Sequence, residues 1–439
     1  MSPTNRAESL SKRLFWLIEK EKALYTLTRR NFLRFGVASS GALLSACKTP
    51  LISEPRLLNP CEMALPQHLV EHPLVTSAFE GLDPQQLWDA HVHLVGTGDS
   101  DSGIELSSQL FNPIYMRQYT QRLLYMNAGC VHEVNETSVD RAYITRLRNL
   151  MDALPEGVKL LLLAFDRSYR ADDTPLRNFT SIYVPNDYTQ RVAALYPQRM
   201  EWACSIHPYR EDAVTALRSA AAAGARAVKW LPPAMGMDPS SPLCDPFYEE
   251  LARLRMPLLT HTGEEHAVEG AAAQALGNPL LLRRALERGV VVIMAHCATL
   301  GSHIDLDEGK DGPEVSSFTL FRRMMENPDY HGLLYGDLSA ITLRNRPTDV
   351  IAELLEREAW HPRLLFGSDY PLPGILPLTS LPLLARAGLL DGEAVMPLAE
   401  IRRHNPILFD LILKRNLRSK GRGFSVEVFE NKRVFMHDT

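Results

Sequence analysis

Short apolar runs alternate with amphipathic stretches along most of this chain. Eight runs of four to eight residues are mostly apolar, at residues 87–94, 158–165, 201–207, 225–231, 257–262, 290–295, 333–338 and 363–366. A continuous apolar run of this length is typical of a strand that is buried on both faces. The runs therefore predict the strands of a parallel sheet.

The segments between these runs predict helices. Residues 212–223, 279–288 and 348–358 have amphipathic, helical periodicity. Asn278 offers a capping side chain before a first-turn proline, and Gly224 and Gly289 stand where helices commonly end in a left-handed residue. Strands and helices therefore alternate, as in a sheet that is covered by helices.

Eight such units over roughly 330 residues fit a closed (β/α)8 TIM barrel. The alternative is an open doubly wound sheet, but no G-x-G-x-x-G or phosphate-binding loop follows a predicted strand. We therefore predict an α/β protein with a barrel over residues 81–416. Residues 96–155 form a long insertion after the first strand, which we expect to cover the active site. Residues 417–439 predict a small C-terminal β-hairpin tail.

Charge separates the first 46 residues from the rest of the chain. They hold eight Lys and Arg against three Asp and Glu, a net charge of +5, whereas the whole chain of 439 residues has −5 and the remainder therefore −10. An acidic body without a long basic run argues against nucleic acid as a partner. The 45% apolar content is that of a soluble globular protein.

The basic segment has the pattern of a targeting signal. Thr28-Arg29-Arg30-Asn31-Phe32-Leu33-Arg34 precedes a mildly apolar run of about a dozen residues, too short to span a bilayer. The segment resembles a bacterial twin-arginine signal, and Leu44-Ser45-Ala46-Cys47 resembles a lipobox. The resemblance implies export to the periplasm or envelope, removal of residues 1–46 and membrane anchoring through lipidated Cys47, with residues 47–80 as a linker. An amphipathic helix with a coincidental arginine pair is the alternative.

Six cysteines lack the spacing of a disulfide scaffold or a cysteine-based metal site. Cys204 and Cys297 lie in apolar runs, which predicts buried thiols. In an exported protein Cys61 could pair with Cys130 or with Cys244. The sequence leaves these two pairings open.

Ionisable side chains stand at the ends of the predicted strands. His91 and His93 point to the same face of the first strand, because side chains alternate with period two, so they can chelate a divalent metal. Four more ionisable residues end or follow the fourth, fifth, sixth and eighth strands: Lys229, His261, His296 and Asp369. These strand ends meet at one mouth of a barrel, so we expect a shared site.

Each of these residues also has a structural alternative. His261 and His296 could be core histidines, Lys229 an ion-paired side chain, and Asp369 a loop or cap residue. His207, at the end of the third strand, is expected to line the substrate site or to serve the structure rather than to bind metal. Their joint position at strand ends favours a functional site.

The order of these motifs resembles the amidohydrolase superfamily, and within it the amidohydrolase-related metal-dependent hydrolases and decarboxylases. The resemblance covers roughly residues 87–411. It rests on Asp89-Ala90-His91-Val92-His93, Gly224-Ala225-Arg226-Ala227-Val228-Lys229, Thr260-His261-Thr262-Gly263, Met294-Ala295-His296-Cys297, Leu365-Phe366-Gly367-Ser368-Asp369-Tyr370-Pro371 and Arg403-His404-Asn405-Pro406-Ile407-Leu408-Phe409.

The resemblance implies one divalent ion, most often zinc, with Asp369 also accepting a proton from water and His296 orienting the nucleophile or polarising the substrate. The implied ligands are His91, His93, His261 and Asp369. In some superfamily members a lysine at the position of Lys229 is carboxylated and bridges two ions, so two ions are the alternative to one.

The leading functional hypothesis is hydrolysis of a small ester, lactone or amide. The first alternative is non-oxidative decarboxylation of an unsaturated or aromatic carboxylic acid, for which arginines in two loops could hold the carboxylate: Arg167, Arg170, Arg344 and Arg346. The second is an anchored binding protein without turnover. The partner that the sequence predicts is a small-molecule substrate, whose identity it does not give. It also indicates no oligomeric state.

Overall fold

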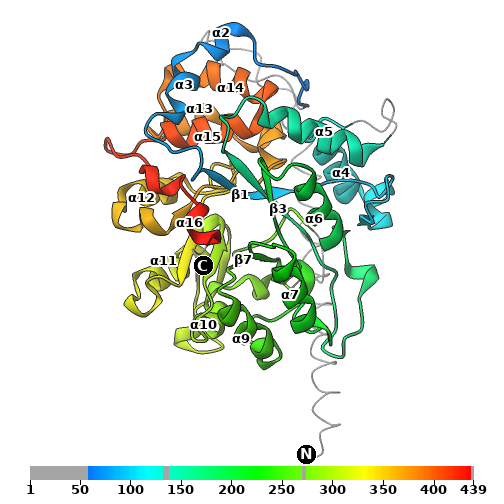
Figure 1. Cartoon of the computed structure of the whole chain (residues 1–439). Coiled ribbons are helices and arrows are strands. Elements are labelled where there is room, and N and C mark those ends of the chain that lie inside the picture. Colours follow the sequence, from blue (N-terminus) through cyan, green and yellow to red (C-terminus); the bar gives the residue numbers. More distant parts are fainter. Residues whose placement is uncertain (1–57, 132–137, 269–272, 437–439) are drawn as a thin grey trace, which may run out of the picture. The chain divides into compact units, whose positions relative to one another are not determined.

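The computed structural model describes residues 58–131, 138–268 and 273–436 (Figure 1). The expected signal, with Arg29, Arg30 and Cys47, lies outside the described residues. Among the helices of the described ranges, none combines the length and the apolar character that crossing a bilayer requires.

Eight parallel strands form the predicted (β/α)8 barrel, and each falls on a predicted run. One sheet has the order β1-β3-β5 and the other β12-β11-β8-β7-β6. A parallel bridge from Cys204 to Val228 joins them at one seam, and a bridge from Val92 to Tyr370 joins them at the other. The strands are β1 (Trp88–His93), β3 (Lys159–Leu163), β5 (Met200–Ala203), β6 (Val228–Trp230), β7 (Leu258–His261), β8 (Val292–Ala295), β11 (Leu334–Asp337) and β12 (Leu364–Leu365).

Helices surround the strands (Figure 1). The predicted helix at 212–223 is α7, which is followed by Gly224 at φ +87°. The segment 279–288 begins as a 3-10 helix, η6 (Pro279–Leu282), capped by Asn278 and continued by α10 (Arg283–Leu286). The other main helices are α6 (Asn186–Leu195), α7 (Ala213–Ala222), α9 (Asp245–Leu254), α11 (Ser317–Glu326), α12 (Thr348–Glu356), α13 (Leu381–Arg386), α14 (Val395–His404) and α15 (Pro406–Asn416).

Alternate strand residues form two separate apolar clusters. Leu161 and Leu163 belong to a small cluster in the barrel interior, and Leu160 and Leu162 belong to the larger cluster beneath the helices. This period of two is the one expected of strands that are buried on both faces. A polar residue that stands at an inward-facing position at the end of a strand therefore points into the mouth of the barrel.

A β-bulge in β1 aims the two histidines. Asp89 pairs with Leu160 and Val92 with Leu162, so β1 has one residue more than β3 between these pairs. Ala90 belongs to the interior cluster, but Val92 belongs to the outer one. A bulge changes which residues face a given side, and here it turns His91 and His93 toward the mouth.

The insertion at 96–155 carries two helices, α4 (Met116–Ala128) and α5 (Val139–Met151), and the short strand β2 (Glu105–Leu106). β2 pairs antiparallel with β4 (Ile182–Tyr183), which belongs to the loop after β3. A disulfide joins Cys61 to Cys130, which selects one of the two pairings left open, and Cys204, Cys244 and Cys297 are buried free thiols.

Two segments at the ends of the described chain differ from the expectation. Part of the predicted linker is helical, in α2 (Gln67–Val70), α3 (Pro73–Thr76) and the 3-10 helix η1 (Ser77–Phe79), and Leu69 of α2 and Ala78 of η1 are buried in the main hydrophobic core. The predicted C-terminal hairpin is wrong for the described tail.

Two short helices occupy that tail, η14 (Val426–Val428) and α16 (Lys432–Phe435). Val434 and Phe435 join the interior cluster of the barrel, and Phe435 stacks on Trp88 with ring centroids 5.9 Å apart. The alternating apolar residues therefore fill the amino-terminal end of the barrel instead of pairing with each other.

Candidate metal centre

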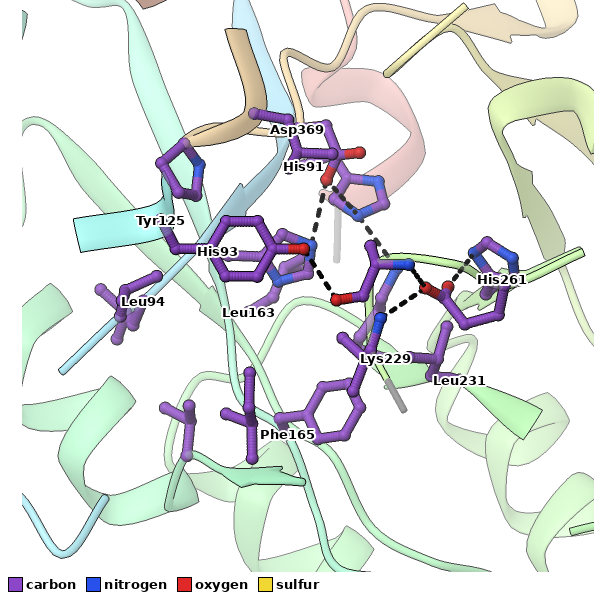
Figure 2. Close-up of a pocket in the computed structure, with 18 of the residues that line it drawn as sticks. His91, His93, Leu94, Tyr125, Leu163, Phe165, Lys229, Leu231, His261 and Asp369 are labelled. Carbon is purple, nitrogen blue, oxygen red and sulfur yellow. Dashed lines mark hydrogen bonds and ion pairs between the residues drawn. The ribbon is translucent and has the colours of Figure 1, made fainter. Parts of the chain in front are cut away.

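The ionisable residues predicted at the strand ends meet in one pocket. His91, His93 and Asp369 line it together with Lys229 and two further histidines, His261 and His296. Figure 2 shows Asp369 and His91 beside each other, with Lys229 and His261 on another side of the pocket. The barrel therefore brings together residues that are widely separated in sequence.

His91, His93 and Asp369 form one compact donor group. Oδ1 of Asp369 lies 3.1 Å from Nε2 of His93 and 3.5 Å from Nε2 of His91. The three donor atoms lie within 4.8 Å of one another. Two imidazole nitrogens and a carboxylate oxygen converging in this way are a donor set that suits a divalent transition metal.

Asp337 and Ser339 orient the histidines from behind. Oδ2 of Asp337 lies 2.5 Å from Nδ1 of His91. Because a carboxylate only accepts, Nδ1 carries the proton and Nε2 keeps its lone pair toward Asp369. Nδ1 of His296 likewise donates to the backbone oxygen of Ser339 over 2.9 Å, and the Ser339 hydroxyl donates to Asp337 over 2.7 Å.

His261 lies beside this donor group without completing it. Its ring centroid is 5.1 Å from that of His296, but its Nδ1 lies 3.2 Å from Oε2 of Glu265 and its Nε2 lies 3.3 Å from the backbone oxygen of Glu264. The carboxylate of Glu265 also accepts from the backbone N–H of Val268 over 2.7 Å. His261 is therefore in the pocket as predicted, but its nitrogens face Glu264 and Glu265.

Lys229 is buried at the polar end of the pocket. Its Nζ lies 3.0 Å from Nε2 of His91. Burial lowers the pKa of Lys229 to about 8, although the nearby carboxylates of Asp369, Asp337 and Glu265 oppose the change. The amine therefore lies beside a nitrogen of the donor group.

Electrostatics keep the donor set ready to bind a cation. Burial alone would raise the pKa of Asp369, but the surrounding imidazoles of His91, His93 and His296 hold it well below its usual value. Burial lowers the pKa of His93 and lowers that of His296 to about 3. The carboxylate is therefore ionised and these two imidazoles are neutral near pH 7, which is the protonation state that metal binding needs.

Local backbone geometry places the two residues that follow strands. His296 has φ +59° and Asp369 has φ +62°, both in the left-handed region that costs a non-glycine residue roughly 1 to 2 kcal/mol. Oδ1 of Asp89 accepts from the backbone N–H of Ser368 over 2.8 Å and so ties β1 to the loop of Asp369. Backbone strain of this kind is typical of functional sites.

His207 and the four candidate arginines lie elsewhere. His207 is buried, with Nε2 3.2 Å from the backbone oxygen of Met235, and is absent from the residues that line the pocket. Of the two roles expected for His207, these contacts favour the structural one. The arginines are also absent from that lining: Arg167, Arg170, Arg344 and Arg346.

Apart from Glu265 and Tyr125, the other residues that line the pocket are apolar. Leu94, Phe165 and Leu231 are among the apolar side chains of its wall (Figure 2). Tyr125 of the insertion also lines the pocket, and its hydroxyl donates to the backbone oxygen of Ala267 over 2.7 Å. The insertion therefore contributes one wall of the pocket, and that hydroxyl already has an acceptor.

Sequence reasoning missed Asp337, Ser339 and Glu265. Asp337 ends the seventh strand as Asp369 follows the eighth, so the rule of polar residues at strand ends would have found it. Ser339 and Glu265 lie in loops, where no periodic pattern marks a residue that faces the site.

The chain is similar to known proteins in sequence pattern and in fold. The family model described as amidohydrolase matches residues 88–375. Among curated proteins, none matches the sequence. Sixty-three chains of solved structures match the fold, with low sequence identity among those described here.

Three of these structures are a TIM-barrel protein, a decarboxylase and a hydratase. The first, from Bordetella bronchiseptica, has 18% identity, TM-score 0.42, and coverage of 72% of this chain and 98% of its own. The 2,6-dihydroxybenzoate decarboxylase from Rhizobium has 14% identity, TM-score 0.36, and coverage of 74% and 97%. The 4-oxalomesaconate hydratase from Rhodopseudomonas palustris has 14% identity, TM-score 0.41, and coverage of 80% and 95%.

The family model covers well over half of the chain and spans the barrel from β1 to the loop after β12. The histidines and the aspartate of the donor group lie inside this match. Amidohydrolases generally bind a divalent metal, and the donor set described above fits one. This chain belongs to the amidohydrolase family.

Proposed function

We propose that the protein is a metal-dependent hydrolase that cleaves a small ester, lactone or amide. The observation that carries the proposal is the donor group of His91, His93 and ionised Asp369 at the polar end of a largely apolar pocket. A divalent ion bound there, zinc in this proposal, would supply an acidified water and polarise the carbonyl oxygen.

The residues of the chain divide the remaining work. Asp369 accepts the proton that the attacking water loses and returns it to the leaving group. His296 presents Nε2 to the pocket because its Nδ1 donates to Ser339, so it can accept a hydrogen bond that orients the water. The apolar walls exclude bulk water, which strengthens these electrostatic interactions.

Activity with and without metal tests the proposal. We expect the zinc-loaded protein to hydrolyse members of a panel of aryl esters, lactones and anilides, and to lose this activity on chelation. Asp369→Ala should lower kcat by about 100-fold to 10,000-fold while the fold is retained. The exposed Asp311→Ala is the matched control. Release of carbon dioxide from aromatic carboxylates without cleavage of any ester would replace the hydrolase by the decarboxylase alternative.

Metal content tests a further part of the proposal, which is that one ion suffices. The alternative is a pair of ions bridged by a carboxylated Lys229, whose Nζ lies 3.0 Å from Nε2 of His91. Elemental analysis per folded chain, with and without bicarbonate, should give about one ion in both cases. A value near two with bicarbonate would assign Lys229 to a bridge.

We also propose that the protein acts outside the bacterial cytoplasm, anchored through Cys47. The disulfide between Cys61 and Cys130 supports this, because such bonds persist in oxidising compartments. Mass spectrometry of the mature protein should find a lipidated residue 47 at its N-terminus. An intact, unmodified Met1 terminus would contradict the proposal.

A further inference from the structure

The pocket separates into a polar end and a continuous apolar wall. Five connections of the barrel contribute apolar side chains to this wall, two of them from the loop after β3: Leu94, Phe165, Val184, Leu231, Val268 and Leu372. Figure 2 shows Leu94 and Phe165 on the side of the pocket away from Asp369 and His261. A substrate with its carbonyl near Asp369 would therefore lay the rest of its structure against hydrocarbon.

Positive charge is confined to the polar end. Of the described residues that line the pocket, the only lysine or arginine is Lys229, whose Nζ faces His91. Carboxylates that enter a protein pocket are usually held by an arginine or another cation, because burial of an unpaired charge is costly. The apolar wall offers no cationic partner to a carboxylate on the part of the substrate that lies against it.

The nearby arginines are engaged or exposed. Arg167 forms an ion pair with Glu105 and lies over the ring of Tyr183, 3.4 Å from its centroid. Arg346 is buried and does not line the pocket; one of its terminal nitrogens donates to the hydroxyl of Thr299 over 2.9 Å, while its Nε has no hydrogen-bond partner among the described residues. Arg170 and Arg344 are exposed. A carboxylate on the substrate, remote from the reacting carbonyl, would therefore be more stable in solvent than against this wall.

We infer that the substrate has a single polar group, the reacting carbonyl group, and an uncharged apolar body, as in an alkyl or aryl ester, lactone or amide that carries no carboxylate. This inference rests on the proposed hydrolase function. In the reaction water adds its oxygen to the carbonyl carbon, the bond from that carbon to the alcohol or amine breaks, and the leaving group takes a proton. The apolar body stays unchanged against the wall.

A matched series of esters tests this specificity. For the zinc-loaded protein, kcat/KM for 4-nitrophenyl acetate, butyrate and hexanoate should rise by roughly fourfold for each methylene that the wall buries. The 4-nitrophenyl monoester of glutaric acid, which ends in a carboxylate, should be at least tenfold poorer than the butyrate ester. A glutarate monoester that equals or exceeds butyrate would overturn the inference and leave the hydrolase proposal intact.

A charge introduced into the wall should reverse the preference. Leu372 lines this wall and is 9% exposed, so Leu372→Arg adds a guanidinium to the wall. We expect the ratio of glutarate to butyrate ester turnover to rise at least tenfold. Leu195→Arg, at an exposed position on α6, should leave the ratio unchanged. An unchanged ratio in a folded Leu372→Arg protein would contradict the inference.

Binding separates this inference from the proposed activity. Calorimetry with hexanoate and with glutarate, on the metal-loaded and metal-free protein, should show tighter binding of hexanoate. If neither ester series is cleaved, the hydrolase proposal fails, and hexanoate binding still decides what the wall accepts. Tighter binding of glutarate would sink the inference whether or not the protein turns over an ester.

Discussion

The carboxylate of Asp337 contacts the imidazole of His91 on the side opposite to the donor group, with Oδ2 and Nδ1 2.5 Å apart and both side chains buried. The contact fixes which nitrogen of His91 is protonated and the direction in which the other one points. The imidazole of His91 and a bond from Ser339 lower the pKa of Asp337 to about 2, although burial opposes this. A negative charge therefore stands behind His91 of the donor group over the whole neutral pH range.

Asp337→Asn should weaken metal binding because the amide lacks the charge that holds His91 in this tautomer. We expect zinc affinity, measured by competition with a chromophoric chelator, to fall by about 10-fold to 100-fold. Ser339→Ala should have a smaller effect in the same direction. Asp311→Asn, at an exposed site, serves as the control. Equal affinity of a folded Asp337→Asn protein would show that the contact does not tune the metal site.

The pH dependence of stability should report His207. Burial lowers its pKa to about 3 from an ordinary value of 6.5. Between these values the unfolded chain binds a proton that the folded chain does not, so the free energy of unfolding falls as the pH falls. A single such histidine contributes a slope of about 1.4 kcal/mol per pH unit well inside this window.

His207→Gln should remove this contribution. Urea unfolding from pH 4 to pH 8 should give a shallower dependence on pH below 6 for the variant, by about one proton. Above pH 7 the free energies of unfolding of the two proteins should change with pH in the same way, which is the internal control. Equal slopes below pH 6 would mean that His207 binds its proton in the folded state as readily as in the unfolded one.

The disulfide between Cys61 and Cys130 should stabilise the domain by closing a loop of 69 residues in the unfolded chain. Replacing both cysteines by serine should cost about 2 to 5 kcal/mol of unfolding free energy. Thermal unfolding with and without a reductant provides the measurement. The reductant should lower the melting temperature of the parent protein only, and an effect of equal size on the double variant would refute this role.

Phe435 should contribute to stability far from the site. It is buried in the barrel interior and stacks on Trp88. Phe435→Ala should therefore cost about 3 to 5 kcal/mol, because it removes a large side chain from a packed core. Phe179→Ala, at an exposed position, should change stability little. Chemical unfolding compares the two, and similar small losses would place residue 435 outside the folded core.

The barrel and the position of its site follow from the sequence because they depend on simple periodicities. Eight apolar runs give the strands, and His91, His93, Lys229 and Asp369 mark one end of them. The bulge in β1 could not be predicted, since it depends on register with β3. Without it, the same two histidines would have faced the surrounding helices.

Other features depend on contacts across long sequence separations. The alternation near Val434 and Phe435 suits a hairpin and a short helix equally, and only the vacant end of the barrel decides between them. Glu265 reaches His261 through a loop, and the turn that carries it has no distinctive pattern. His207 has the strand-end position of a site residue, but its ring packs between Tyr169 and Tyr209 instead.

The stacking of Phe435 on Trp88 also determines when, during synthesis, the barrel can complete its fold. β1 is the first barrel strand to be synthesised, and its interior face is sealed by a residue made more than three hundred positions later. Almost the whole polypeptide must therefore be synthesised before the amino-terminal end of the barrel interior is shielded from water. A polypeptide that stopped before Phe435 would leave the interior face of β1 open to solvent.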